Sequence, residues 1–137
     1  MSKQLTKTYD SISDRECLER TLHGKFTTNV RTISYRKGQG LSIVAFDNIT
    51  PLCADIYLAG VGDWCSRTVI SHFLHFAFDT LKVKRIVAYI DTENEKSIKF
   101  SRRLGFKREC TLRGLNVYQY SLLKKDSKYY GIYKRFI

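Results

Sequence analysis

The chain has 137 residues, of which 43% are hydrophobic and 13% aromatic, so it is long enough to bury one core and too short for two; a single domain over residues 1–137 is expected. Its apolar runs are too short to span a membrane, and its N-terminal residues lack the apolar stretch of a secretory signal, which predicts a cytoplasmic protein without a membrane partner. With 24 basic and 13 acidic residues, the formal charge of +11 fits three polyanionic targets: nucleic acid, an acidic protein surface and a phosphate-bearing cofactor. One cofactor cannot account for so many cations, so the excess either faces a macromolecule or is simply solvated.

The cysteine and histidine pattern predicts no metal site. Four cysteines are scattered through the chain without a C-x-x-C pair, which argues against a zinc ribbon and against a redox dithiol. His72 and His75 could be imagined as ligands together with Cys65, but a fourth ligand at a familiar spacing is missing.

The first half of the chain predicts strands around one helix. Residues 5–9 can form a strand, and the capping box Ser13-x-x-Glu16 predicts a helix to about His23 that Gly24 ends. Residues 30–35 and 41–46 are predicted as a hairpin joined by a turn at 37–40. Residues 52–58 are apolar nearly throughout, as in a central strand, and the glycine-containing segment from Gly60 is predicted to break that strand.

The second half predicts a βαβ unit followed by more strands. From about Ser66 apolar residues recur every three and four positions, which predicts a helix. Residues 85–91 then form a strand, residues 95–104 a helix that ends at Gly105, and residues 107–112 and 116–123 two further strands. The tail at 124–137 is predicted as a final strand or as an arm that docks on a partner. This order of elements predicts an α+β domain in which one crossover supplies a parallel pair of strands.

The motif Asn94-x-x-Ser97, followed by Leu104-Gly105-Phe106, resembles the GNAT (Gcn5-related) N-acetyltransferases, particularly the branch that acetylates protein N-termini such as those of ribosomal proteins. The resemblance implies a mixed, mostly antiparallel sheet flanked by helices, with splayed central strands. It also implies acetyl-CoA as cosubstrate and an amine acceptor, expected on a protein or peptide. The compact size, together with a phosphate loop at residues 62–68 that departs from the family pattern, also resembles bacteriophage-encoded members, which would place the protein in a host cytoplasm or a virion.

The same resemblance implies where the cofactor binds. Acetyl-CoA would lie between residues 52–59 and 85–91, beside a β-bulge that leaves backbone N–H groups unpaired. The family's phosphate loop has two small residues where this chain has Trp64 and Ser66, and Asp63 has the wrong charge for a pyrophosphate. The cofactor-binding residues expected from the resemblance are Leu58, Gly60, Gly62, Ser66, Arg67, Thr68, Asn94, Ser97 and Arg103.

For catalysis, the resemblance places Ser101 where many members have a tyrosine that protonates the leaving thiolate. Asp55, on the central strand, is the expected base. Tyr57 and Tyr118 are reserve candidates, and Glu109 is expected to pair with a neighbouring arginine.

Three functions remain open on these grounds. The first is an active N-acetyltransferase. The second is a catalytically inactive GNAT-fold binding or assembly protein, which the altered phosphate loop and the missing tyrosine motivate. The third is contact of the basic surface with nucleic acid or an acidic protein, for which charge is the signal. A homodimer formed through residues 129–137 is also possible.

Overall fold

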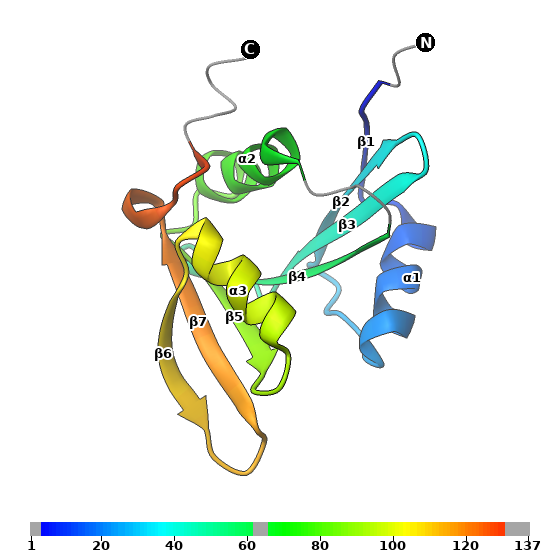
Figure 1. Cartoon of the computed structure of the whole chain (residues 1–137). Helices are drawn as coiled ribbons and strands as arrows, with labels where there is room; N and C mark the ends of the chain where they lie inside the picture. Colours follow the sequence, from blue (N-terminus) through cyan, green and yellow to red (C-terminus); the bar gives the residue numbers. More distant parts are fainter. Residues whose placement is uncertain (1–3, 62–65, 131–137) are drawn as a thin grey trace.

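The computed structural model describes residues 4–61 and 66–130. Seven strands form one sheet in the order β1-β2-β3-β4-β5-β7-β6 (Figure 1). The elements are β1 (Thr6–Tyr9), α1 (Ile12–Leu22), β2 (Arg31–Lys37), β3 (Gly40–Asp47), β4 (Cys53–Val61), α2 (Arg67–His75) with a turn of π-helix (Phe76–Thr80), β5 (Arg85–Asp91), α3 (Glu95–Leu104), β6 (Lys107–Leu112), β7 (Val117–Leu123) and a 3₁₀ turn (Lys124–Asp126).

The sheet is mostly antiparallel and has one parallel pair. All neighbouring strands run antiparallel except β4 and β5, which the α2 crossover connects. These two strands are paired only over Cys53–Asp55 and Arg85–Val87 and separate beyond that point. The predicted α+β architecture with splayed central strands is therefore confirmed.

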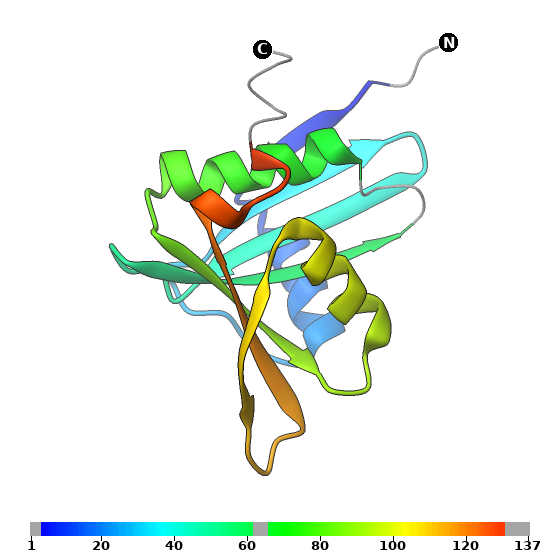
Figure 2. The ribbon, with the colours of Figure 1, turned by 60° about the vertical axis from the view of Figure 1, so that its left-hand side comes forward.

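Helices cover the two faces of the sheet unequally (Figure 2). The larger core cluster joins one face of the sheet to α2 and α3 and includes Phe46, Phe73 and Leu104. The smaller cluster lies under α1 on the other face and centres on Leu18, Ile43 and Ala45. Alternate residues of β3 enter the two clusters, as the two-residue period of a strand requires.

Four details of the first half differ from the prediction. Helix α1 is capped by Ser11, whose side chain accepts from the Asp14 N–H at 3.3 Å. Its last residue is Leu22, and His23, with φ 57°, takes the C-cap position in place of Gly24. Strand β4 does not break at Gly60, because β3 pairs with it as far as Val61. The pairing of β3 with β4 shows no register shift, so the predicted bulge is absent from these described strands; the sheet's shift lies in β6, between Arg108 and Cys110.

The second half follows the prediction closely. Ser66 caps α2 by accepting from the Val69 N–H at 3.2 Å, and Asn94 caps α3 by accepting from the Ser97 N–H at 3.2 Å. Gly105 ends α3 with φ 108°. The tail was predicted as a final strand or a docking arm, and within its described residues, 124–130, there is a 3₁₀ turn at 124–126 and no strand. The predictions for the tail beyond residue 130, including the dimerisation arm, and those for Gly62, Asp63, Trp64 and Cys65 lie outside the described residues. None of the helices in the described ranges is long and apolar enough to cross a membrane.

Candidate active site between strands β4 and β5

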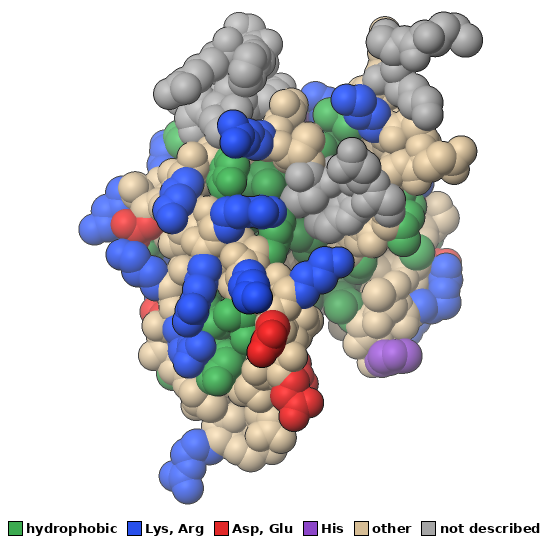
Figure 3. Space-filling model, in the orientation of Figure 1, with side chains coloured by type: hydrophobic (Ala, Val, Ile, Leu, Met, Phe, Trp, Pro, Cys, Tyr) green, Lys and Arg blue, Asp and Glu red, His purple; other side chains and the backbone are tan. Residues whose placement is uncertain are grey.

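A cleft of about 880 Å³ opens where β4 and β5 separate. Residues 56–60 of β4 form one wall, residues 88–91 of β5 the other, and α3 closes it along one side. Figure 3 shows the molecule hollowed between the parts that carry α3 and α1. Since β5 pairs with β4 no further than Asp55, the β4 edge from Ile56 onward has backbone groups that β5 does not satisfy. A ligand with amide and carbonyl groups can supply the missing hydrogen bonds.

Two tyrosines occupy matching positions on the separating strands. Tyr57 and Tyr89 each lie two residues beyond the last paired residues, Asp55 and Val87, and both line the cleft. Burial, reinforced by nearby carboxylates, raises the pKa of both tyrosines, so both hydroxyls are protonated at neutral pH. Within the described residues neither hydroxyl has a hydrogen-bond partner. The cleft therefore offers two hydroxyl groups that can donate to a ligand.

Carboxylates lie on the same side of the sheet as these tyrosines. Asp55 is directly opposite Asp47 in the β3–β4 ladder. Burial raises the pKa of Asp55, with a hydrogen bond from the Asn48 amide at 2.8 Å acting against the rise. Asp47 accepts from the backbone and the hydroxyl of Thr27 at 3.0 and 2.5 Å. Asp55 does not line the cleft itself, but its charge contributes to the raised pKa of both tyrosines.

Helix α3 supplies positive charge to the opposite side of the cleft. Lys96, Lys99 and Arg103 all line it, and their spacing of three and four residues places them on one face of the helix. The guanidinium of Arg103 lies 5.6 Å from the centre of the Phe100 ring, which also lines the cleft. Three cations on one wall suit a ligand with several phosphates.

The structure brings together five of the expected cofactor-binding residues. Those that line the cleft are Leu58, Gly60, Asn94, Ser97 and Arg103. Ser66, Arg67 and Thr68 lie at the beginning of α2 and do not line it, and Gly62 is outside the described residues.

The expected catalytic residues lie elsewhere than on the cleft wall. Ser101 is buried, and its hydroxyl donates to the carbonyl oxygens of Ser97 at 2.8 Å and Ile98 at 3.1 Å. Glu109 pairs with Arg85 at 2.5 Å, as expected. Of the reserve candidates, Tyr118 lies under the guanidinium of Arg108, 3.7 Å from the ring centre, and Tyr57 lines the cleft.

Sequence reasoning missed Lys96, Lys99 and Tyr89 as residues of the cleft. A signal existed for the two lysines, because they share a helical face with Arg103. The position of Tyr89 depends on the parallel register of β4 and β5, which the sequence does not specify.

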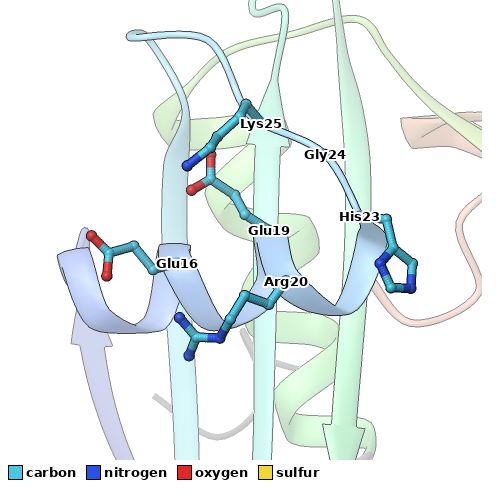
Figure 4. A pocket seen from close by; sticks show the side chains of 6 residues that line it. All are labelled: Glu16, Glu19, Arg20, His23, Gly24 and Lys25. Carbon is cyan, nitrogen blue, oxygen red and sulfur yellow. The ribbon is translucent and has the colours of Figure 1, made fainter.

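A second hollow lies beside α1 (Figure 4). It measures about 540 Å³ and is lined by both charge signs, including Glu16, Arg20 and Lys25. The carboxylate of Glu19 accepts a hydrogen bond from the backbone N–H of Phe26 at 2.8 Å. No large apolar side chain contributes to its described lining, so the cleft between β4 and β5 is the better candidate for an active site.

Comparisons with known proteins agree on the fold. Residues 64–107 match the model of the acetyltransferase (GNAT) domain. The N-acetyltransferase PseH of Campylobacter jejuni in complex with acetyl coenzyme A is 14% identical, with a TM-score of 0.67 over 88% of this chain and 99% of that one. Spermidine N-acetyltransferase from Vibrio cholerae in complex with CoA and spermine is 18% identical, with a TM-score of 0.67 over 90% of this chain and 97% of that one. The sequence matches no curated protein.

Proposed function

We propose that this chain, whose residues 64–107 match the model of the GNAT acetyltransferase domain, is an N-acetyltransferase that moves acetyl from acetyl-CoA directly to an amine. The observation that supports this most strongly is the cleft at the point where the parallel pair β4–β5 separates. It combines an unpaired strand edge, two protonated tyrosines and a cationic wall. These are the groups that a thioester, a leaving thiolate and a chain of phosphates respectively require.

The residues of the cleft fit acetyl-CoA part by part. The backbone of β4 at 56–60 can hydrogen-bond the thioester carbonyl and the pantetheine amides, while Asn94 and Ser97 flank the same space. Lys99 and Arg103 can bind phosphate oxygens. We also propose that the N-terminus of α2, capped by Ser66 and followed by Arg67 and Thr68, contributes to phosphate binding through its unpaired N–H groups.

Transfer requires a neutral amine to attack the thioester carbon, so that a C–N bond forms and the C–S bond breaks. The departing sulfur carries negative charge, and we propose that the Tyr57 hydroxyl stabilises it by donating a hydrogen bond. This role replaces the one expected for Ser101, whose hydroxyl is already donated to its own helix. Asp55 remains the proposed base for the proton that the attacking nitrogen loses, since its raised pKa favours proton acceptance at a carboxylate.

The acceptor is proposed to be an amine on a protein or peptide, as in the branch that acetylates N-termini. The carboxylates of Asp47 and Asp55 lie on the α1 side of the sheet, away from the cationic α3 wall, and they favour approach of a positively charged amine from that side. A polyamine satisfies the same charge requirement, and the structurally similar Vibrio cholerae protein is a spermidine N-acetyltransferase. An assay with N-terminal peptides and spermidine in parallel distinguishes the two acceptors.

The role of Tyr57 is tested by release of free CoA thiol from acetyl-CoA in the presence of each acceptor, with product identity checked by mass spectrometry. Tyr57→Phe should lower kcat by about 10- to 100-fold, the size expected for loss of a hydrogen bond to the leaving group, with little change in acetyl-CoA affinity. Tyr89→Phe is the matched control, because Tyr89 lines the same cleft but is 44% exposed, and it should keep most of the activity. Equal losses in both variants would contradict the role given to Tyr57.

The same experiment separates this proposal from a catalytically inactive binding protein. An inactive protein would bind acetyl-CoA, or fail to bind it, without transferring acetyl to any acceptor. Turnover with a defined acceptor excludes that alternative.

A further inference from the structure

A second surface, outside the cleft, joins the C-terminal end of α3 to the segment at 124–128. The backbone N–H of Lys128 donates to the carbonyl oxygen of Leu104 at 3.2 Å, so the two segments are in direct contact. Strand β6 begins two residues after Gly105, and the side chain of Lys107 reaches Asp126 at 3.6 Å. Residues distant in sequence therefore share one continuous surface.

This surface is strongly basic. We define the basic face as the exposed cations of residues 99–104 of α3, of the first residues of β6 and of the segment at 124–128: Lys99, Arg102, Arg103, Lys107, Arg108, Lys124, Lys125 and Lys128. In Figure 3 lysine and arginine side chains gather over α3 and beside it. Within the described part of the chain, only Lys107 and Lys124 of this set form ion pairs, with Asp126 and Asp79. Most of the positive charge is therefore not neutralised by the protein.

The proposed cofactor does not account for this charge. Of the basic face, only Lys99 and Arg103 line the cleft. Arg102, Lys125 and Lys128 lie outside it and form no ion pair within residues 4–61 and 66–130. Like charges gathered on one surface repel one another and so destabilise the folded protein when no ligand is bound. A polyanion bound to this surface would remove that repulsion.

The composition of the face favours nucleic acid over an acidic protein. Protein interfaces have an apolar core that is enriched in aromatic residues. The large hydrophobic residues that are exposed in the described chain are Tyr9, Ile12, Leu22, Leu52, Val61, Tyr89 and Leu115, and none belongs to the elements of the basic face. Binding of a nucleic-acid backbone, by contrast, is dominated by charge and needs no apolar core.

The two tyrosines that follow the segment at 124–128 do not provide a platform for bases, and the ring of Tyr118 is covered by the guanidinium of Arg108. Tyr130 is stacked on His75 with ring centres 4.2 Å apart, and its hydroxyl donates to Asp79 at 2.5 Å. Tyr129 is half-buried against the core. Recognition through this face therefore relies on phosphate groups and does not read the base sequence.

We propose that the basic face binds the phosphate backbone of nucleic acid, next to the cleft and independently of acetyl transfer. Two sets of variants test this. The first is Arg102→Gln, Lys125→Gln and Lys128→Gln together. The second is the control Arg20→Gln, Lys25→Gln and Lys37→Gln, which removes the same charge from exposed residues around α1 and the β2–β3 turn.

The measurement is fluorescence anisotropy of a labelled RNA duplex, and of a DNA duplex of the same sequence, titrated with full-length protein at several salt concentrations. The first triple variant should bind the duplexes more weakly, and the slope of log K against log salt concentration should become shallower by about 3, roughly one for each phosphate group that the variant no longer neutralises. The control triple variant should keep most of the affinity and most of the salt dependence. Circular dichroism of each variant confirms folding, and acetyl-CoA titration, expected to be unchanged, reports separately on the proposed function.

Three results would overturn the proposal. They are the absence of binding to either duplex, equal loss of affinity in the two triple variants, and a preference for polyglutamate at equal charge. The last result would assign the face to an acidic protein. A preference between the RNA and the DNA duplex would identify the source of the phosphates and leave the proposal standing.

Discussion

The backbone of Gly105 lies against the carbonyl oxygen of Asp126, so substitution of Gly105 gives the sharpest test of the packing of α3 against residues 124–128. Gly105 ends α3 with φ +108°, and a Cβ built there would overlap the carbonyl oxygen of Asp126 and lie 3.3 Å from Leu122 Cδ1. Gly105→Ala therefore combines backbone strain with a collision against the segment at 124–128. The strain costs about 1–2 kcal/mol, and making room in a packed site typically costs about 1–3 kcal/mol more.

Two other glycines separate these contributions. Gly114 has φ +78° with nothing within 4 Å of a built Cβ, so Gly114→Ala should show the strain alone, about 1 kcal/mol after the gain from a less flexible unfolded chain. Gly24 also has open space and does not have a φ in the strained range, so Gly24→Ala should be neutral or stabilising by less than about 1 kcal/mol. The expected order of stability is Gly24→Ala, then Gly114→Ala, then Gly105→Ala.

Urea denaturation followed by circular dichroism measures all three variants. Gly105→Ala should lose about 3 kcal/mol of unfolding free energy, which corresponds to a fall in Tm of roughly 10 °C for a domain of this size. If Gly105→Ala and Gly114→Ala were equally destabilising, the packing of α3 against residues 124–128 would be wrong.

Two further predictions concern α2. Ser66→Ala should lower the free energy of unfolding by about 1 kcal/mol in the same urea assay, because it removes the cap on the Val69 N–H. The control is Ser13→Ala: the Ser13 hydroxyl contacts only the Ser11 hydroxyl among described residues, so its loss should change stability by less than about 0.5 kcal/mol. Equal effects of the two variants would contradict the capping role of Ser66. Burial, with smaller effects of Lys7 and His75, lowers the pKa of His72 to about 4. As pH falls below about 6.5, His72 therefore becomes protonated in the unfolded chain while it stays neutral in the folded chain. The free energy of unfolding, measured by urea denaturation at each pH, should therefore fall by up to about 3 kcal/mol between pH 6.5 and 4. His72→Gln should flatten this part of the plot of stability against pH. An unchanged plot would refute the assignment of the pH dependence to His72.

The order and type of the elements could be predicted because local signals coincided with tertiary structure. The hairpin of β2 and β3 had a glycine-containing turn between alternating strands, and α3 had Asn94 at one end and Gly105 at the other. Each signal acts within a few residues, so no knowledge of distant contacts was needed.

The predictions that were wrong concern details decided by contacts between residues distant in sequence. The Ser13 box was a valid local pattern, but the Asp14 carboxylate accepts hydrogen bonds from Ser34 and Arg36 of β2 at 2.7 and 2.8 Å. These contacts favour a helix that begins at Ile12 with Ser11 as its N-cap. Strand β4 continues through Gly60 because β3 pairs with it there. In both cases a contact distant in sequence decided the outcome.

The candidate site shows the same division. Asn94 and Ser97 were found through a short motif, and Lys96 and Lys99 could have been found because they share a helical face with Arg103. The position of Tyr89, by contrast, depends on the register of β4 and β5. The engagement of the Ser101 hydroxyl with its own helix was likewise invisible in the sequence, because a serine in a helix can point its hydroxyl to solvent or to the preceding turn.

The central claim is that the cleft between β4 and β5 binds acetyl-CoA. The most direct measurement is calorimetric titration of the protein with acetyl-CoA at physiological salt, beside Lys99→Glu/Arg103→Glu, which reverses two charges of the cleft wall, and Arg20→Glu/Lys25→Glu, which reverses two beside α1. Saturable one-to-one binding that the first pair weakens at least about 10-fold, and that the second pair leaves nearly unchanged, is the predicted result. Absence of saturable binding, or equal weakening by the two pairs, would contradict the account.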